Sequence, residues 1–136
     1  MNRFDPSRAD WARILIVERS REDLEVLETA VQRRGLETIG TRQPDVGLQM
    51  IRDHNPDLIL LDIESISTDY AKLFGRFEAE SQSRRTPLVL LGKNQRSQRD
   101  MPSGVHVPTP YHYAPLLRRI EELLDRPQRS GGTAAA

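Results

Sequence analysis

Short strand-like runs alternate along the chain with amphipathic helical patterns, and this alternation constrains the fold more than any other feature. The strand-like runs cover residues 13–17, 36–41, 57–63, 87–92 and 105–107. The helical patterns cover residues 20–35, 45–54, 68–82 and a last stretch that starts near Pro115. Largely apolar strands separated by helices indicate a parallel sheet covered on both faces. Right-handed crossovers make such a sheet doubly wound, so the sequence predicts an α/β fold.

The first helix is marked at both ends. Ser20 is a good N-cap residue, and Asp23 follows it by three positions. Leu27 and Val31 fall on one helical face, and Gly35 is the residue type that commonly ends a helix. A helix between Ser20 and Gly35 is therefore expected to bury one apolar face against the sheet.

The 136 residues suffice for one domain with a substantial core. We expect that domain to cover residues 12–125. Residues 1–11 are polar and are expected to form a flexible lead-in. Residues 126–136 are small and polar, and are expected to form a disordered tail or the remnant of a linker.

Composition argues against several functions. Lys and Arg number 20, as do Asp and Glu, so the formal net charge is zero and nothing indicates nucleic-acid binding. There is no cysteine, which excludes disulfides and thiolate catalysis and suits a reducing cytoplasm. No apolar run approaches the length of a membrane span, and the N-terminus lacks the apolar core of a signal peptide. We therefore expect a cytoplasmic protein that binds neither nucleic acid nor membrane.

Two carboxylates follow strand-like runs directly. Glu18 comes after residues 13–17, and Asp62 lies at the end of the apolar run Leu-Ile-Leu-Leu. In open parallel sheets, ligands bind at the carboxyl ends of the strands. Glu18 and Asp62 are therefore expected at the same edge of the sheet, as a candidate site.

Several segments match a known family. The chain contains PDLILLDI at 56–63, ILIV followed by an acid, TPLVLLG, and a proline–aromatic pair at 110–111. With these segments the chain resembles a response-regulator receiver domain of two-component signalling (CheY-like) over residues 12–125. The resemblance implies a flavodoxin-like, five-stranded parallel sheet in the order 2-1-3-4-5.

The resemblance also implies a chemistry. Asp62 matches the aspartate that accepts a phosphoryl group from a histidine kinase or phosphotransfer protein in a phosphorelay. Glu18, Asp62 and the backbone carbonyl of Glu64 match the positions that bind Mg²⁺, although Glu18 is longer than the usual aspartate and binding is expected to be weak. Beyond this self-phosphotransfer, no enzyme activity is implied.

The matching site is degenerate. Arg19 replaces a second acid, Gly92 replaces a Ser or Thr, and Thr109 replaces a lysine. Losing one preorganised donor typically costs on the order of 10²–10³ in rate. Lys93 and Arg19 are candidate substitutes that could neutralise a phosphate.

Other positions of the match also depart from the family. His106 stands at the position of the aromatic switch residue, and Ser65-Ile66 replace the usual Met-Pro. His106 has two interpretations, a partly buried strand residue or a pH switch. Glu18 also has two, a metal ligand or a surface partner of Arg19.

The segment after Gly92, KNQRSQRDMPSGVHVP, has almost no apolar residue before Met101. A helix without an apolar stripe has little to pack against. We therefore expect the family's fourth helix to be shortened or missing, and its usual readout surface to be rebuilt.

Two functions stay open. In the first, the chain is a phospho-accepting receiver that acts on an unknown output protein through protein–protein interaction, with dimerisation as one route. In the second, it is a pseudo-receiver, a binding module that works without phosphorylation.

Overall fold

The computed structural model describes residues 12–66, 70–92, 104–107 and 112–125. Five parallel strands form one sheet in the order β2-β1-β3-β4-β5. The strands are β1 (Arg13–Val17), β2 (Glu37–Thr41), β3 (Leu58–Asp62), β4 (Leu88–Leu91) and β5 (Gly104–Val107). The predicted fold class and strand order are therefore confirmed.

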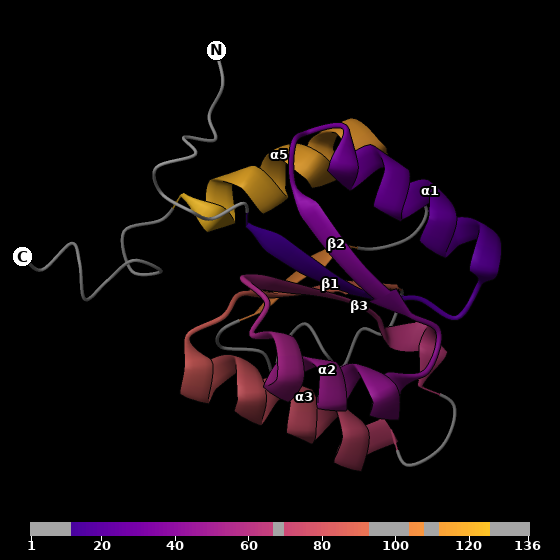
Figure 1. Cartoon of the computed structure of the whole chain (residues 1–136). Coiled ribbons are helices and arrows are strands. Elements are labelled where there is room, and N and C mark those ends of the chain that lie inside the picture. Colours follow the sequence, from indigo (N-terminus) through magenta and orange to yellow (C-terminus); the bar gives the residue numbers. More distant parts are fainter. Residues whose placement is uncertain (1–11, 67–69, 93–103, 108–111, 126–136) are drawn as a thin grey trace, which may run out of the picture.

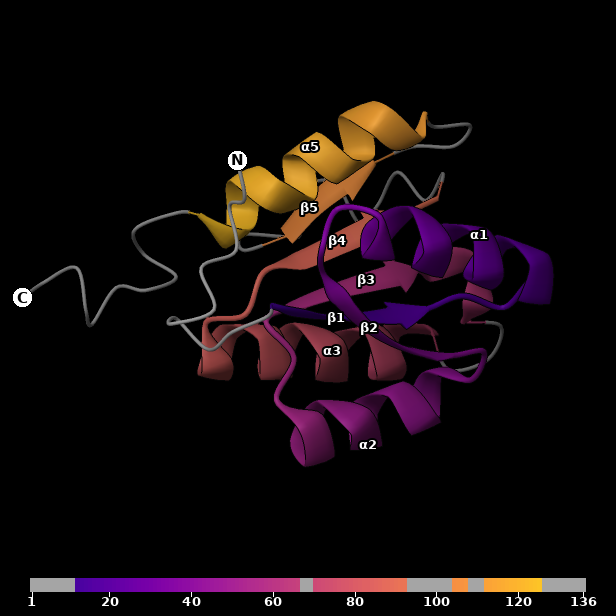
Figure 2. The ribbon, with the colours of Figure 1, turned by 45° about the horizontal axis from the view of Figure 1, so that its top comes forward.

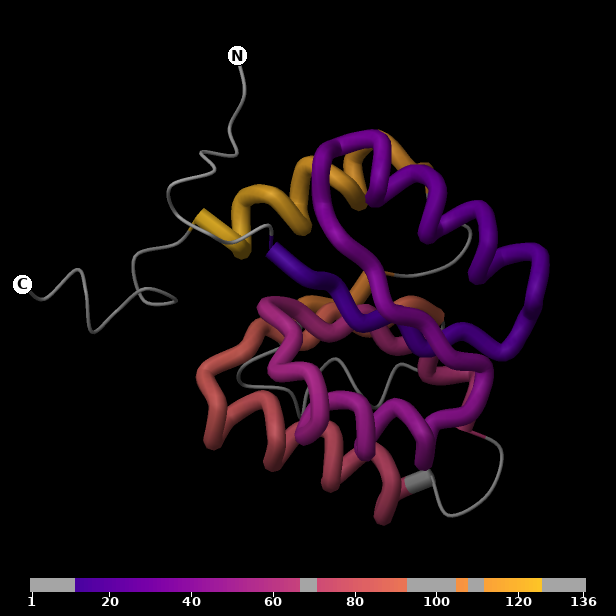
Figure 3. The backbone as a smooth tube through the Cα atoms, viewed as in Figure 1, coloured from indigo at the N-terminus to yellow at the C-terminus, as the bar shows by residue number. Residues whose placement is uncertain are grey.

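Helices cover both faces of the sheet (Figure 1). They are α1 (Arg21–Gln32), α2 (Pro44–His54), α3 (Tyr70–Arg84) and α5 (Tyr113–Leu124), and a short 3-10 turn, η2 (Ile63–Ser65), follows β3. The helices α1 and α5 lie on one face, and α2 and α3 lie on the other, as the tilted view in Figure 2 shows. Figure 3 follows the backbone from α1 through β2 to α2 on the opposite face.

Alternate side chains of each strand enter two separate cores. Ile14 and Ile16 of β1 pack with α1 and α5, whereas Leu15 and Val17 pack with α2 and α3. Since side chains point alternately to the two faces of a strand, a continuous apolar run is what two covered faces require. The central strand β3 is buried along its whole length, which places Asp62 at the end of the most enclosed strand.

Ser20 and Gly35 act at the two ends of α1 as the sequence predicts. The Ser20 hydroxyl accepts a hydrogen bond from the Asp23 backbone N–H, which satisfies one of the free donors at the helix start. The helix ends at Gln32, and Gly35 has a φ of 84°, a conformation that glycine adopts without strain. Leu27 and Val31 are buried, so the predicted apolar face is the packed one.

Some expectations fall outside the described residues. The shortened or missing fourth helix concerns residues 93–103, and the terminal segments 1–11 and 126–136 are likewise outside them. Among the helices of the described ranges, none has the length and apolar character that a membrane crossing needs.

Candidate functional site

Asp62 ends β3 and begins the turn that follows. Its Oδ1 atom accepts a hydrogen bond from the Glu64 backbone N–H at 3.0 Å, and its Oδ2 atom accepts one from the Ser65 hydroxyl at 3.2 Å. The carboxylate thereby caps η2. Only 9% of the residue is exposed, so the aspartate lies at the rim of the sheet but is largely enclosed.

Glu18 reaches the same rim from β1. Its backbone N–H donates to the Thr41 carbonyl at 3.0 Å, which holds it beside β2. Its Oε2 atom accepts the Ser20 backbone N–H at 3.1 Å, and its carboxyl group is hydrogen-bonded to Asp62. The structure thus places the two carboxyl groups at one edge of the sheet, in direct contact.

The environment of Glu18 favours its neutral form. Burial, the hydrogen bond with Asp62 and the nearby charges of Asp62 and Asp23 raise the pKa of the Glu18 carboxyl to about 8. Because this pKa lies above neutral pH, Glu18 holds its proton at pH 7. Glu18 is only 5% exposed, whereas Arg19 is exposed. The interpretation of Glu18 as a surface partner of Arg19 is therefore wrong.

Ser65 is a component of the site that the sequence reasoning missed. Its hydroxyl accepts the Arg19 backbone N–H at 2.9 Å and donates to Asp62 Oδ2. It is 7% exposed. The available signal was a hydroxyl residue between Ile63 and Ile66, in a turn whose neighbours are apolar and buried.

Arg19 contributes its backbone to this network, while its side chain lies at the surface. The Arg19 carbonyl accepts a hydrogen bond from Arg42 Nε at 3.0 Å. Arg42, in the turn between β2 and α2, was also missed by the sequence reasoning. Both arginines are exposed, so they add positive charge to the rim near the carboxyl pair.

Gly92 follows β4 and lies so close to Ile63 that a larger residue at this position would collide with the Ile63 side chain. Its φ is 137°, a region that residues with side chains rarely adopt. A Cβ atom built there lies 2.6 Å from Ile63 Cγ1 and 3.4 Å from Glu64 Cγ. A hydroxyl residue at position 92 therefore requires Ile63 to move.

The other predicted residues are placed as follows. Glu64 is exposed in η2. His106 is half-buried in β5, opposite Leu90 of β4, which is the position of an ordinary strand residue. Lys93 and Thr109 lie outside the described residues.

Tyr113, at the start of α5, is a further residue near the carboxyl pair. Its burial, together with the negative charges of Asp23 and Glu18, raises the pKa of its phenol. Its distance in sequence from Glu18 hides this proximity from sequence reasoning. The start of α5 is therefore electrostatically linked to the candidate site.

The chain supplies the ligand types that Mg²⁺ accepts, but the described arrangement does not fit the ion. Magnesium binds carboxylate and other oxygen ligands in a near-octahedral geometry. Here Glu18 and Asp62 hydrogen-bond each other, and both Asp62 oxygens accept bonds from the turn. Within the described ranges, no group of three or more His, Cys, Asp or Glu residues gathers around a common point, so the carboxylates available to an ion at this rim are those of Glu18 and Asp62. A cation would have to displace the Glu18 proton and rearrange the pair.

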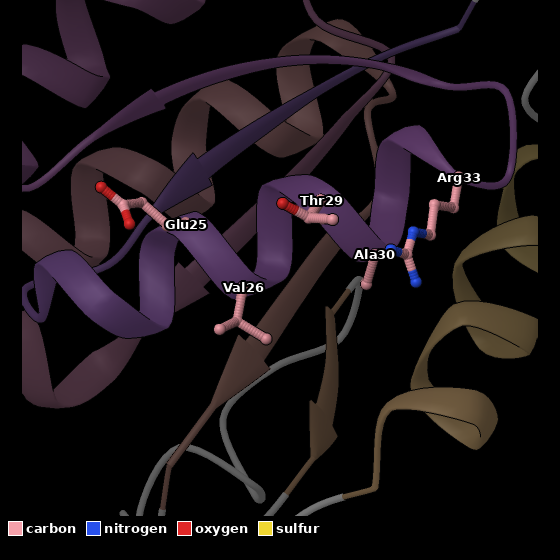
Figure 4. Close-up of a pocket in the computed structure, with 5 residues that line it drawn as sticks. All are labelled: Glu25, Val26, Thr29, Ala30 and Arg33. Atoms are coloured by element: carbon pink, nitrogen blue, oxygen red, sulfur yellow. The ribbon is translucent and has the colours of Figure 1, made fainter.

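A shallow cavity lies elsewhere, along α1. It is lined by Glu25, Val26, Thr29, Ala30 and Arg33, and Figure 4 shows Val26 and Ala30 on the same side of the helix. None of these residues belongs to the carboxyl pair or its hydrogen-bond partners. This cavity is therefore separate from the candidate site.

No protein-family model matches the chain, and no curated protein is significantly similar to it in sequence. Solved structures are similar in fold. A response regulator receiver protein from Sinorhizobium medicae is 16% identical, with a TM-score of 0.71 over 84% of this chain and 94% of that one. The receiver domain of a Francisella response regulator is 19% identical, with a TM-score of 0.72 over 85% and 98%.

A third solved structure is also similar in fold. It is a response regulator receiver modulated diguanylate cyclase from Pelobacter carbinolicus, 20% identical, with a TM-score of 0.69 over 90% of this chain and 97% of that one. The class that these comparisons define is the doubly wound receiver fold. The chain has the CheY-like fold of response-regulator receiver domains. Fold alone does not fix chemistry, so function must be argued from the site.

Proposed function

We propose that the chain is a receiver-type signalling module that acts through protein–protein contacts, with Asp62 as its candidate phosphoryl acceptor. The donor would be a histidine kinase or a phosphotransfer protein. One observation carries this proposal: a carboxylate stands at the carboxyl end of the central strand, beside a second acid from β1. This edge is where doubly wound sheets place their reactive groups.

Phosphoryl transfer to Asp62 requires a carboxylate oxygen that can attack phosphorus. An Asp62 oxygen would form a bond to phosphorus as the P–N bond of a phosphohistidine breaks, and the departing imidazole nitrogen would keep the electron pair. Each Asp62 oxygen already accepts one hydrogen bond, from the Glu64 N–H or from Ser65, and these bonds reduce its nucleophilicity without blocking attack, because a carboxylate oxygen has a second lone pair. Phosphoryl transfer depends mostly on positioning and charge neutralisation. We therefore expect transfer to Asp62 to be slow and weakly coupled to output.

A second candidate function is the phosphorylation-independent pseudo-receiver. Two observations favour it. The buried carboxyl groups of Glu18 and Asp62 are hydrogen-bonded to each other, and the side chain of Ile63 fills the space that a hydroxyl residue at position 92 would need. Such a module would bind its partner in a single conformation. Both candidate functions are compatible with an output protein as partner and with dimerisation. Both also assume a cytoplasmic location.

The test is intact-mass spectrometry of the protein after incubation with acetyl phosphate, with and without Mg²⁺. Three proteins are compared: wild type, Asp62→Asn, and Asp45→Asn, an exposed aspartate of α2 that serves as the matched control. One phosphoryl adduct on wild type and Asp45→Asn, absent from Asp62→Asn, is expected if Asp62 is the acceptor. An adduct that persists in Asp62→Asn would contradict the assignment.

A wild type that stays unmodified over long incubation would favour the second candidate. The double variant Glu18→Asp, Thr109→Lys then distinguishes a site that lacks the necessary reactive groups from one in which Asp62 is inaccessible. If it gains an adduct, the fold retains an acceptor position that the natural residues disable. If it also stays unmodified, the acceptor proposal fails for this fold.

A further inference from the structure

A continuous hydrogen-bonded chain connects Asp62 to the loop after β1. The Arg19 backbone N–H donates to Ser65 Oγ at 2.9 Å, and Ser65 Oγ donates to Asp62 Oδ2 at 3.2 Å. The two bonds join residues that are 46 and 3 positions apart in the sequence. Ser65 is therefore the link between the turn after β3 and the loop after β1.

The direction of these bonds is fixed by the donors. A serine hydroxyl has a single hydrogen, and the Arg19 backbone N–H can only donate. The hydroxyl hydrogen is thus left for Asp62. Ser65 is 7% exposed, so water competes little for these bonds, and bonds in series in such surroundings polarise one another. A change at Asp62 is therefore felt at the Arg19 amide.

The Arg19 peptide is held on its other side as well. Its carbonyl accepts Arg42 Nε at 3.0 Å, while the neighbouring Ser20 N–H donates to Glu18. The loop after β1 is thus fixed at successive backbone groups. A change transmitted through Ser65 therefore reaches a short segment that includes the exposed residue Arg19.

Within the described part of the chain, the end of β4 offers no hydroxyl to Asp62. Gly92, which follows β4, has no side chain, and Ile63 occupies the adjoining space. Among the described residues, Ser65 is the one whose hydroxyl donates a hydrogen bond to Asp62, and it comes from the turn after β3 rather than from β4.

We infer that Ser65 is a positioning residue that transmits the state of Asp62 to the backbone of the loop at residues 18–20. The signalling use of this link rests on the proposed function. The link itself is a property of the unmodified fold, so it can be tested separately.

The first measurement is amide hydrogen exchange of Arg19 by NMR in the full chain, in wild type, Ser65→Ala, Asp62→Ala and the double variant. Loss of one such hydrogen bond corresponds to about a fivefold faster exchange of the Arg19 amide. Ser65→Ala and Asp62→Ala are each expected to show faster exchange. In the Ser65→Ala background, Asp62→Ala is expected to have no further effect on Arg19.

Two variants guard against a general loss of structure. Ser83→Ala removes an exposed hydroxyl of α3 and is expected to leave Arg19 exchange unchanged. Ser65→Thr keeps the hydroxyl and is expected to retain most of the wild-type protection. Equal losses in Ser65→Thr and Ser65→Ala would assign the effect to packing and overturn the inference. An equal effect of Asp62→Ala with and without the Ser65 hydroxyl would also overturn it.

The second measurement uses protein treated with acetyl phosphate. On formation of the Asp62 adduct, the Arg19 amide resonance is expected to shift in wild type and to shift far less in Ser65→Ala. Absence of any adduct in wild type would count against the proposed function, while the exchange measurement would still decide the role of Ser65.

Discussion

The carboxyl groups of Glu18 and Asp62, carried to one rim by β1 and β3, are hydrogen-bonded to each other. Both residues are more than nine-tenths buried. Burial of Glu18, reinforced by its contact with Asp62, raises the pKa of Glu18 to about 8 and keeps a proton at the rim at neutral pH. The stability of the fold and the state of the candidate acceptor are therefore linked through pH.

We expect the free energy of unfolding to fall as the pH rises from about 5 to about 9. Burial and Asp62 raise the pKa of folded Glu18 from 4.5 to about 8, so the folded state binds a proton that the unfolded chain releases. The stabilisation is fully present below pH 4.5 and is lost as the pH rises through 8. Urea denaturation across this range measures it. Glu18→Gln should flatten the dependence, whereas Glu22→Gln, on the exposed side of α1, should leave it intact.

Asp62→Asn is expected to lower the pKa of Glu18 without restoring its ordinary value. The substitution removes the negative charge of Asp62, but burial, the largest cause of the shift, remains. Carboxyl ¹³C resonances of Glu18 followed against pH give the answer. An unchanged midpoint in the variant would show that contact with Asp62 has no part in the shift.

Gly92→Thr is expected to destabilise the fold by about 1–3 kcal/mol, because a residue with a side chain is strained at this φ and its Cβ meets Ile63. Thermal or urea denaturation measures the loss. Gly75→Ala is the matched control, because a Cβ there meets no atom within 4 Å. Gly75 lies in α3, where alanine is the better helix former, so this variant should be neutral or stabilising. A fully stable Gly92→Thr would contradict the predicted conflict with Ile63.

Ser20→Ala is expected to cost about 1 kcal/mol of stability through loss of the α1 N-cap. The bond that Glu18 receives comes from the Ser20 backbone and should survive. The pH dependence of unfolding should therefore keep its slope while the whole curve moves down. A changed slope would mean that the cap and the carboxyl pair are not independent.

The order of strands and helices could be predicted because its causes are local. The apolar run that makes β3 and the Ser20 cap of α1 can each be found within a few residues of sequence. The roles of Ser65 and Gly92 depend on partners from other elements. Ser65 has a role because Arg19, which follows β1, donates its backbone N–H to the Ser65 hydroxyl. Gly92 has a role because the side chain of Ile63 occupies the adjoining space. Contacts of this kind leave no periodic pattern in the chain.

Asp62 also holds the first turn after β3 closed, since its Oδ1 atom receives the Glu64 N–H. An aspartate at this position therefore stabilises the turn whether or not it takes part in a reaction. Selection for that role alone would retain an aspartate at this position, whether or not a phosphoryl group is transferred to it. The aspartate at the tip of the central strand is therefore part of the architecture of the rim, whatever its part in signalling.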